Sequence, residues 1–246
     1  MSSVGENHRG GFGLIELLVA MAVLGILLSA IIGLTTGFLG FSRRINVINE
    51  RLVDINDAMG YVGLNVRRAM RVAGDEEVTS VTVTGIGDAF DCHLTSTDGA
   101  CLGLLVPVRH ATETWRVDRY DLLAYRVVPI SAWTVDNPGL AEGWAADRTP
   151  LMLEYRARLS CGAPDPVTSN PCPPPPIPSS VAAQQLSLVI ADLAFETAAG
   201  VAFEPFTVAA ETSRVTVRMR SIGSGQNADI TVPGDEPLET VFVRRP

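Results

Sequence analysis

An uncharged stretch near the amino terminus limits what this chain can fold into. No charged residue occurs between Glu16 and Arg43, which leaves 26 consecutive uncharged positions. As an α-helix the stretch would extend about 39 Å at about 1.5 Å per residue, whereas the hydrocarbon core of a bilayer is about 30 Å thick. A cleaved secretory signal has a shorter apolar region, about 7 to 15 residues, followed by a small-residue cleavage site. The one candidate site of that kind, residues 28–30, lies inside the stretch. We therefore expect a membrane-spanning helix.

A second helical pattern continues from this stretch. Apolar residues from Ile45 to Ala73 recur at alternating spacings of three and four, with polar residues between them. This spacing predicts an amphipathic helix over residues 43–74 that ends at Gly74 and continues the helix of residues 12–42. Gly60 and Gly63 each cost about 1 kcal/mol relative to alanine, which indicates a bend or close packing there. A coiled-coil stalk would explain the same spacing.

The period changes to two beyond Gly74, as expected for half-buried antiparallel strands. The alternation is clearest in residues 81–83, 151–159 and 215–219. Further strand candidates are residues 102–108, 115–128, 186–197 and 238–243. The expected fold class is α+β, with a long amino-terminal helix packed on a mainly antiparallel β-sheet formed by residues 75–246.

The four cysteines fall into two local pairs, Cys92 with Cys101 and Cys161 with Cys172. Their spacings lack the short knuckle of two to four residues that structural zinc prefers, so disulfides are favoured over a metal site or free thiols. Four cysteines allow three pairings, and the local one is our choice. Disulfides indicate an oxidising compartment for the β-rich domain.

Charge and composition exclude several functions. The chain contains no lysine, so it has no P-loop lysine, Schiff-base lysine or lysine isopeptide crosslink. The net charge is −8, and a domain this acidic is a poor general binder of nucleic acid. Three arginines in and just after one strand candidate fit a solvated polar sheet face better than DNA capture: Arg214, Arg218 and Arg220.

No pattern of an enzyme or a metal site is present. None of the three histidines, His8, His93 and His110, belongs to a catalytic or zinc-binding motif. The acidic runs at residues 75–77 and 235–236 lack the sequence pattern of a calcium-binding loop, and we expect turns there. We expect no catalytic residue, no metal and no cofactor.

The most informative residues surround the start of the apolar stretch. Glu16 lies at its edge, and a carboxylate well inside a bilayer costs about 2.5 to 3.5 kcal/mol, so Glu16 requires a partner. If the chain were cut between Gly11 and Phe12, Glu16 would be the fifth residue of the product. The new amine of Phe12 would then be a cation available to Glu16 of a neighbouring subunit.

This arrangement resembles the prepilins of the type IV filament superfamily, which includes pilins and type II secretion pseudopilins. The matching features are a leader of residues 1–11 ending in Gly11, a following Phe12, Glu16, and an apolar helix that starts at once. The resemblance implies cleavage after Gly11 by a prepilin peptidase, N-methylation of Phe12, and packing of the helix into a filament with other pilins through Glu16.

The rest of the chain is similar, more loosely, to PilW-type minor pilins and to J-type pseudopilins. The similar segments are residues 64–74, 190–195 and 239–245. Gly33 stands where many major pilins have proline, which also favours a minor subunit. The expected function is a minor pilin that acts in filament assembly, with a pseudopilin at the tip of a secretion pseudopilus as the alternative. A membrane-anchored enzyme is a third hypothesis.

Two signals disagree about the orientation in the membrane. Arg43, Arg44 and Arg51 follow the apolar stretch and only Arg9 precedes it, so the positive-inside rule alone would keep the large domain in the cytoplasm. Long domains translocate despite flanking charge, and the cysteines favour export. We expect a single-pass protein of the inner membrane whose carboxy-terminal domain is periplasmic, and which enters a filament after assembly.

Overall fold

The structure, a computed structural model, describes residues 13–73, 80–83, 89–90, 92, 100–113, 116–129, 150–163, 171–178, 180–197, 199–209, 214–224 and 229–244. Gly11, Phe12, Gly74 and His93 lie outside these residues. The chain forms two compact units, Met1–Asn46 and Val47–Pro246.

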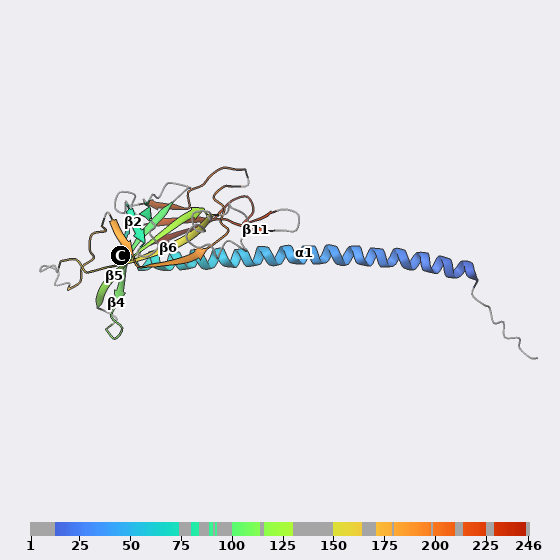
Figure 1. The fold of residues 1–246 in the computed structure, drawn as a ribbon, viewed down its shortest axis with the longest axis horizontal. Helices are drawn as coiled ribbons and strands as arrows, with labels where there is room; N and C mark the ends of the chain where they lie inside the picture. Colours follow the sequence, from blue (N-terminus) through green and yellow to red (C-terminus); the bar gives the residue numbers. More distant parts are fainter. Residues whose placement is uncertain are drawn as a thin grey trace, which may run out of the picture. The chain divides into compact units, whose positions relative to one another are not determined.

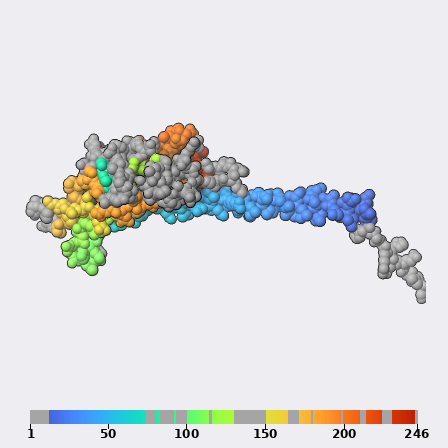
Figure 2. Space-filling view, in the orientation of Figure 1, coloured from blue at the N-terminus to red at the C-terminus, as the bar shows by residue number. Residues whose placement is uncertain are grey.

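The uncharged stretch and the amphipathic pattern form one helix, α1 (Leu14–Arg68), of 55 residues (Figure 1). Its first turn is closed by the carbonyl of Gly13, which accepts hydrogen bonds from the N–H groups of Glu16 at 3.0 Å and Leu17 at 3.3 Å. Every side chain from Leu14 to Leu39 is exposed, and Figure 2 shows this apolar surface in blue. The expected continuation of the helix through Arg43 is confirmed.

The carboxyl end of α1 differs from the prediction. The helix ends at Arg68 rather than Gly74, and residues Arg71–Ala73 form strand β1. The Ala69 N–H donates a hydrogen bond to the Val66 carbonyl at 3.2 Å, three residues earlier, which tightens the last turn. The Met70 N–H donates to the Leu105 carbonyl at 2.7 Å. Residues 71–73 continue the apolar spacing of the helix, but they form a strand that pairs with β4 (Cys101–Arg109). The apolar spacing therefore extends beyond the last residue of the helix.

The remaining strands form four sheets within the described residues. The largest has the order β1-β4-β5-β6-β8, with all neighbours antiparallel, and the second has the order β13-β10-β9, also antiparallel. The third, β3-β2-β7, contains a parallel pair between β2 and β7, and the fourth joins β11 to β12. The bounds are β2 (Ser80–Val83), β3 (Ala89–Phe90), β4 (Cys101–Arg109), β5 (Val117–Pro129), β6 (Pro150–Leu159), β7 (Ser180–Ala183), β8 (Gln185–Ile190), β9 (Phe206–Ala209), β10 (Arg214–Met219), β11 (Ser221–Ser224), β12 (Asp229–Val232) and β13 (Leu238–Val243). The expected α+β class with a mainly antiparallel sheet is confirmed.

The second half of α1 lies in the main core of the domain. Its buried face, centred on Ile55, Met59 and Val62, packs against apolar residues of both the five-stranded sheet and the sheet of β9, β10 and β13. At Gly63 the helix packs closely on β13, because a Cβ atom added there would overlap the ring of Phe242. Gly60, by contrast, faces open space. Close packing therefore explains Gly63 and leaves Gly60 without a role inside the domain.

Strand β6 is buried on both faces over most of its length, which the alternating pattern did not predict. Leu153 and Tyr155 belong to a second core that also contains Val81 of β2 and Ala183 of β7. Met152, on the opposite face, belongs to the main core beside α1. Glu154, expected on a solvated face, is only 3% exposed. The five-stranded sheet is therefore covered on both sides, and the expectation of a half-buried strand was wrong for β6.

Candidate functional site

Glu16 lies in the first turn of α1, where an acidic side chain is stabilised by the positive end of the helix dipole. Its Oε2 accepts a hydrogen bond from the Gly13 N–H at 3.2 Å, and the side chain is otherwise exposed. This bond caps one backbone donor but leaves the second carboxylate oxygen available. The structure thus places Glu16 at the first helical turn, while its expected partner, the amine of Phe12, lies outside the described residues.

The apolar half of α1 has the hydrogen-bonding pattern required in lipid, where every polar group must find a partner inside the protein. The hydroxyl groups of Ser29, Thr35 and Thr36 all donate to backbone carbonyls one turn earlier, at 2.8 to 3.0 Å. The most apolar window of 18 residues has a mean hydropathy of 2.8 and is not buried by the rest of the chain. By length and composition, α1 is able to cross a membrane.

The structure forms the two local disulfides expected from the sequence. Cys92 is joined to Cys101 at the start of β4, and Cys161 is joined to Cys172, with Cα–Cα distances of 5.0 and 4.8 Å. Cys172 is buried, and its carbonyl accepts a hydrogen bond from the buried Tyr120 hydroxyl at 3.0 Å. The second disulfide therefore fastens the proline-rich segment to the five-stranded sheet.

The three arginines near β10 do not form one surface. Arg218 pairs with Glu239 across the strands, with 2.6 Å between Nε and Oε2. Arg220 is 3% exposed and donates to the carbonyls of Glu196, Pro233 and Gly234, so the expectation of a solvated Arg220 was wrong. Of these three described arginines, only Arg214 is fully exposed. This arrangement gives no phosphate-binding patch among the described arginines of β10.

His110 lies in the turn after β4, and its contacts with described residues are local. Its Nδ1 accepts a hydrogen bond from the Thr112 N–H at 3.4 Å and lies 3.0 Å from the Thr112 hydroxyl. The described part of the chain contains no cluster of three histidine, cysteine or acidic side chains that could hold a metal ion.

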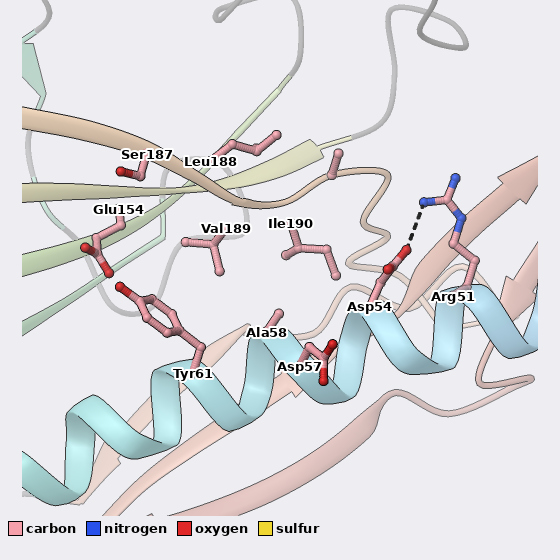
Figure 3. Close-up of a pocket in the computed structure, with 11 residues that line it drawn as sticks. Arg51, Asp54, Asp57, Ala58, Tyr61, Glu154, Ser187, Leu188, Val189 and Ile190 are labelled. Carbon is pink, nitrogen blue, oxygen red and sulfur yellow. Dashed lines mark ion pairs between the residues drawn. The ribbon is translucent and has the colours of Figure 1, made fainter.

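A cleft of about 510 Å³ opens between α1 and β8, and sequence reasoning did not predict it (Figure 3). One wall is the helix surface from Arg51 to Tyr61, the other is the backbone and side chains of residues 187–191, and Glu154 of β6 lies at one end. Arg51 pairs with Asp54 at 3.7 Å and with Asp192 at 2.7 Å. Asp57 forms no ion pair with any described residue. The cleft therefore has apolar residues of β8 on one wall, the Arg51–Asp54 pair at one end, Glu154 at the other, and Asp57 on the helix between them (Figure 3).

Glu154 is an incompletely paired buried carboxylate. Its Oε1 accepts a hydrogen bond from Nη2 of Arg156 at 2.8 Å, while Oε2 has no hydrogen-bond partner in the described structure. Figure 3 shows the carboxylate next to the hydroxyl of Tyr61. A buried charge is costly unless its oxygens are satisfied, and the only donors beside Oε2 in the described structure are the neutral hydroxyls of Tyr61 and Tyr125.

Two tyrosines stand beside this carboxylate. Tyr61 packs edge-to-face on Tyr125 with ring centroids 6.3 Å apart, and Asn65 donates to the Tyr125 hydroxyl at 2.7 Å. Burial raises the pKa of Tyr61 and of Tyr125, and the neighbouring Glu154 raises the pKa of both further. Both phenols therefore stay neutral donors well above physiological pH.

The comparisons with known proteins identify only the amino-terminal segment. Residues 7–32 match the family model described as the prokaryotic N-terminal methylation motif. Searches of curated proteins and of solved structures gave no significant match to the chain. The matched residues include the Gly11–Phe12 junction, Glu16 and the first part of the apolar helix.

Proposed function

Residues 7–32 carry the N-terminal motif of the type IV pilin and pseudopilin superfamily, and on that premise we propose that the chain is a minor pilin of the PilW type. The motif implies processing by a prepilin peptidase, anchoring in a membrane and pilin-type assembly. We propose further that the peptidase cuts between Gly11 and Phe12, that Phe12 is N-methylated, and that the chain acts in filament assembly as a structural subunit without enzymatic activity.

The position of Glu16 is the observation that carries this proposal. It occupies the first turn of α1, directly before the apolar surface that would lie in lipid or in a filament core. Cleavage after Gly11 creates a cationic amine at Phe12, four residues before this carboxylate. In an apolar environment each charge requires an opposite one, so the amine of one subunit and Glu16 of its neighbour stabilise each other.

The domain boundaries follow from the same proposal. Residues 1–11 are the leader, residues 12–42 span the inner membrane and later pack in the filament, and the β-rich domain is periplasmic. The two disulfides support export, because they persist in oxidising compartments. The size and disulfide content of the domain are compatible with a minor subunit and equally with a pseudopilin.

Mass analysis of the amino-terminal peptide tests this proposal. In membrane and sheared-filament fractions of a strain with an active prepilin peptidase, the mature chain is expected to start with N-methylated Phe12. Glu16→Ala is expected to be processed normally but to be lost from filaments, whereas Glu50→Ala, an exposed acid farther along α1, is the control and should enter filaments. An unprocessed chain that starts at Met1 would overturn the proposal. Co-purification of the chain with pili would support the minor pilin, and co-purification with secretion pseudopili would support the pseudopilin.

A further inference from the structure

The cleft beside α1 lies along a free strand edge. β8 is the last strand of the five-stranded sheet, paired with β6 on one side only. Among the described residues, no other strand pairs with the outer edge of its six residues. An unpaired edge presents alternating N–H and C=O groups that can accept another strand. Leu188, on this strand, is 43% exposed.

The charges of the cleft select the chemistry of an occupant. Its acidic groups are Asp54, Asp57 and Glu154, and its one cation, Arg51, is already paired with Asp54 and Asp192. The Glu154 side chain is 97% buried, and its Oε1 pairs with Arg156, whereas Oε2 has no charged partner in the described structure. A cationic donor would pair with this carboxylate more strongly than the neutral hydroxyls of Tyr61 and Tyr125 beside it, because hydrogen bonds between charged groups are stronger than those with a neutral donor.

We propose that the cleft receives a short extended segment of another filament subunit, whose backbone extends the sheet along β8 and whose arginine or lysine pairs with Glu154. The volume fits this occupant, since about 510 Å³ lies within the range of about 300 to 1,000 Å³ for binding pockets and would hold only a few side chains. Only the origin of the segment in a filament subunit rests on the proposed function. The chemistry of the cleft does not depend on it.

Peptide binding to the full chain in detergent micelles tests the proposal directly. The probe is a fluorescent seven-residue peptide of alternating valine and threonine with one central arginine. Two comparison peptides carry glutamate or norleucine at the central position instead. The arginine peptide is expected to bind with a Kd below about 1 mM and at least about tenfold more tightly than the glutamate peptide. Bound peptide is also expected to slow hydrogen exchange of β8 amides.

Variants assign the effect to the cleft. Glu154→Gln keeps the shape of the side chain and should weaken binding of the arginine peptide by about tenfold or more. Glu113→Gln, in the turn between β4 and β5, makes the same change in net charge and should leave affinity within about twofold, since Glu113 does not line the cleft and an exposed charge contributes little. If Glu154→Gln does not fold, Asp57→Asn on the helix surface is expected to weaken binding about threefold, as for an exposed charge.

Three results would overturn the proposal. They are no binding of the arginine peptide at about 1 mM, equal binding of the arginine and glutamate peptides, and equal losses in Glu113→Gln and in the cleft variants. Because peptide binding requires neither cleavage nor N-methylation, these results are separate from the amino-terminal mass analysis. A chain that fails to enter filaments could therefore still bind the peptide.

Discussion

Arg51 and Asp192 form an ion pair that ties α1 to two segments of the β-rich domain. Nη2 of Arg51 lies 2.7 Å from Oδ2 of Asp192. Asp192 has a left-handed backbone with φ of 55°, and its carbonyl accepts hydrogen bonds from the Ser221 hydroxyl at 2.9 Å and the Ile222 N–H at 2.8 Å. One residue therefore joins the helix, the end of β8 and the start of β11.

We expect Arg51→Gln to lower the free energy of unfolding by about 1 to 2 kcal/mol, because a partly buried hydrogen bond between charged groups is lost. Urea unfolding of the full chain in micelles, followed by circular dichroism, measures the change. Asp54→Asn is the control, since its pair with Arg51 is longer at 3.7 Å and more exposed. Its effect should stay within about 0.5 kcal/mol. Equal losses in the two variants would show that the Asp192 contact is not the stabilising one.

The glycines of α1 give a matched pair of substitutions. Gly63→Ala would place a methyl group in the ring of Phe242, which also lies 5.9 Å from the guanidinium of Arg67. Overpacking costs about 1 to 3 kcal/mol and should exceed the helix-propensity gain of about 1 kcal/mol, leaving a net loss of stability. Gly60→Ala meets no atom within 4 Å and should raise stability by about 0.5 to 1 kcal/mol. Thermal unfolding of both variants checks the opposite signs, and a stabilising Gly63→Ala would contradict the packing.

Arg220 is expected to act as a structural cation. Arg220→Lys retains the charge but cannot reach the carbonyls of Glu196 and Gly234 together with the Thr231 hydroxyl, all of which the guanidinium now contacts. Unsatisfied buried acceptors cost about 1 to 3 kcal/mol each, so we expect a loss of about 2 to 4 kcal/mol. Arg214→Lys, at an exposed site, should change the free energy of unfolding by less than about 0.5 kcal/mol. Chemical denaturation distinguishes the two, and similar values would refute the role of Arg220.

The tyrosines beside Glu154 predict a loss of stability in alkali. Their pKa is raised in the folded chain above the usual value of about 10, by burial first and by Glu154 next. Above about pH 10 the unfolded chain therefore loses protons that the folded chain keeps, and stability falls as pH rises, whereas below pH 10 this contribution is fully present. Absorbance at 295 nm and unfolding curves from pH 8 to 11 measure the effect. Tyr61→Phe should flatten the decline, and an unchanged slope would argue against the shift at Tyr61.

Periodic patterns predicted the long elements, and residues without a pattern account for most of what was missed. The spacing of three and four from Ile45 onward predicted the amphipathic part of α1, and the alternation of apolar and polar residues predicted β6 and β10. The end of α1 was misplaced because Met70 is held by Leu105, which is distant in sequence. Strands β7, β9, β11 and β12 have only four residues each, and a period is hard to recognise over so short a length. Of the described four-residue strands, only β2 was predicted, from the alternation of valine and threonine.

The amino-terminal motif was readable from sequence, whereas the cleft was not. Gly11, Phe12 and Glu16 are close together in the chain, so their spacing alone carries the information. Glu154 and Tyr61 meet only because β6 takes its register in the sheet and α1 packs across that face. A charged residue in an alternating strand is usually solvated, and nothing local marks Glu154 as an exception.

The short connection after α1 has a mechanical consequence. Only Ala69 and Met70 separate α1 from β1. The Met70 N–H donates a hydrogen bond to the Leu105 carbonyl, and the Met70 carbonyl accepts one from the Arg244 guanidinium. No loop exists there that could lengthen under tension. A force applied along α1 would therefore act directly on the β1–β4 hydrogen bonds, with no flexible segment between them that could extend first.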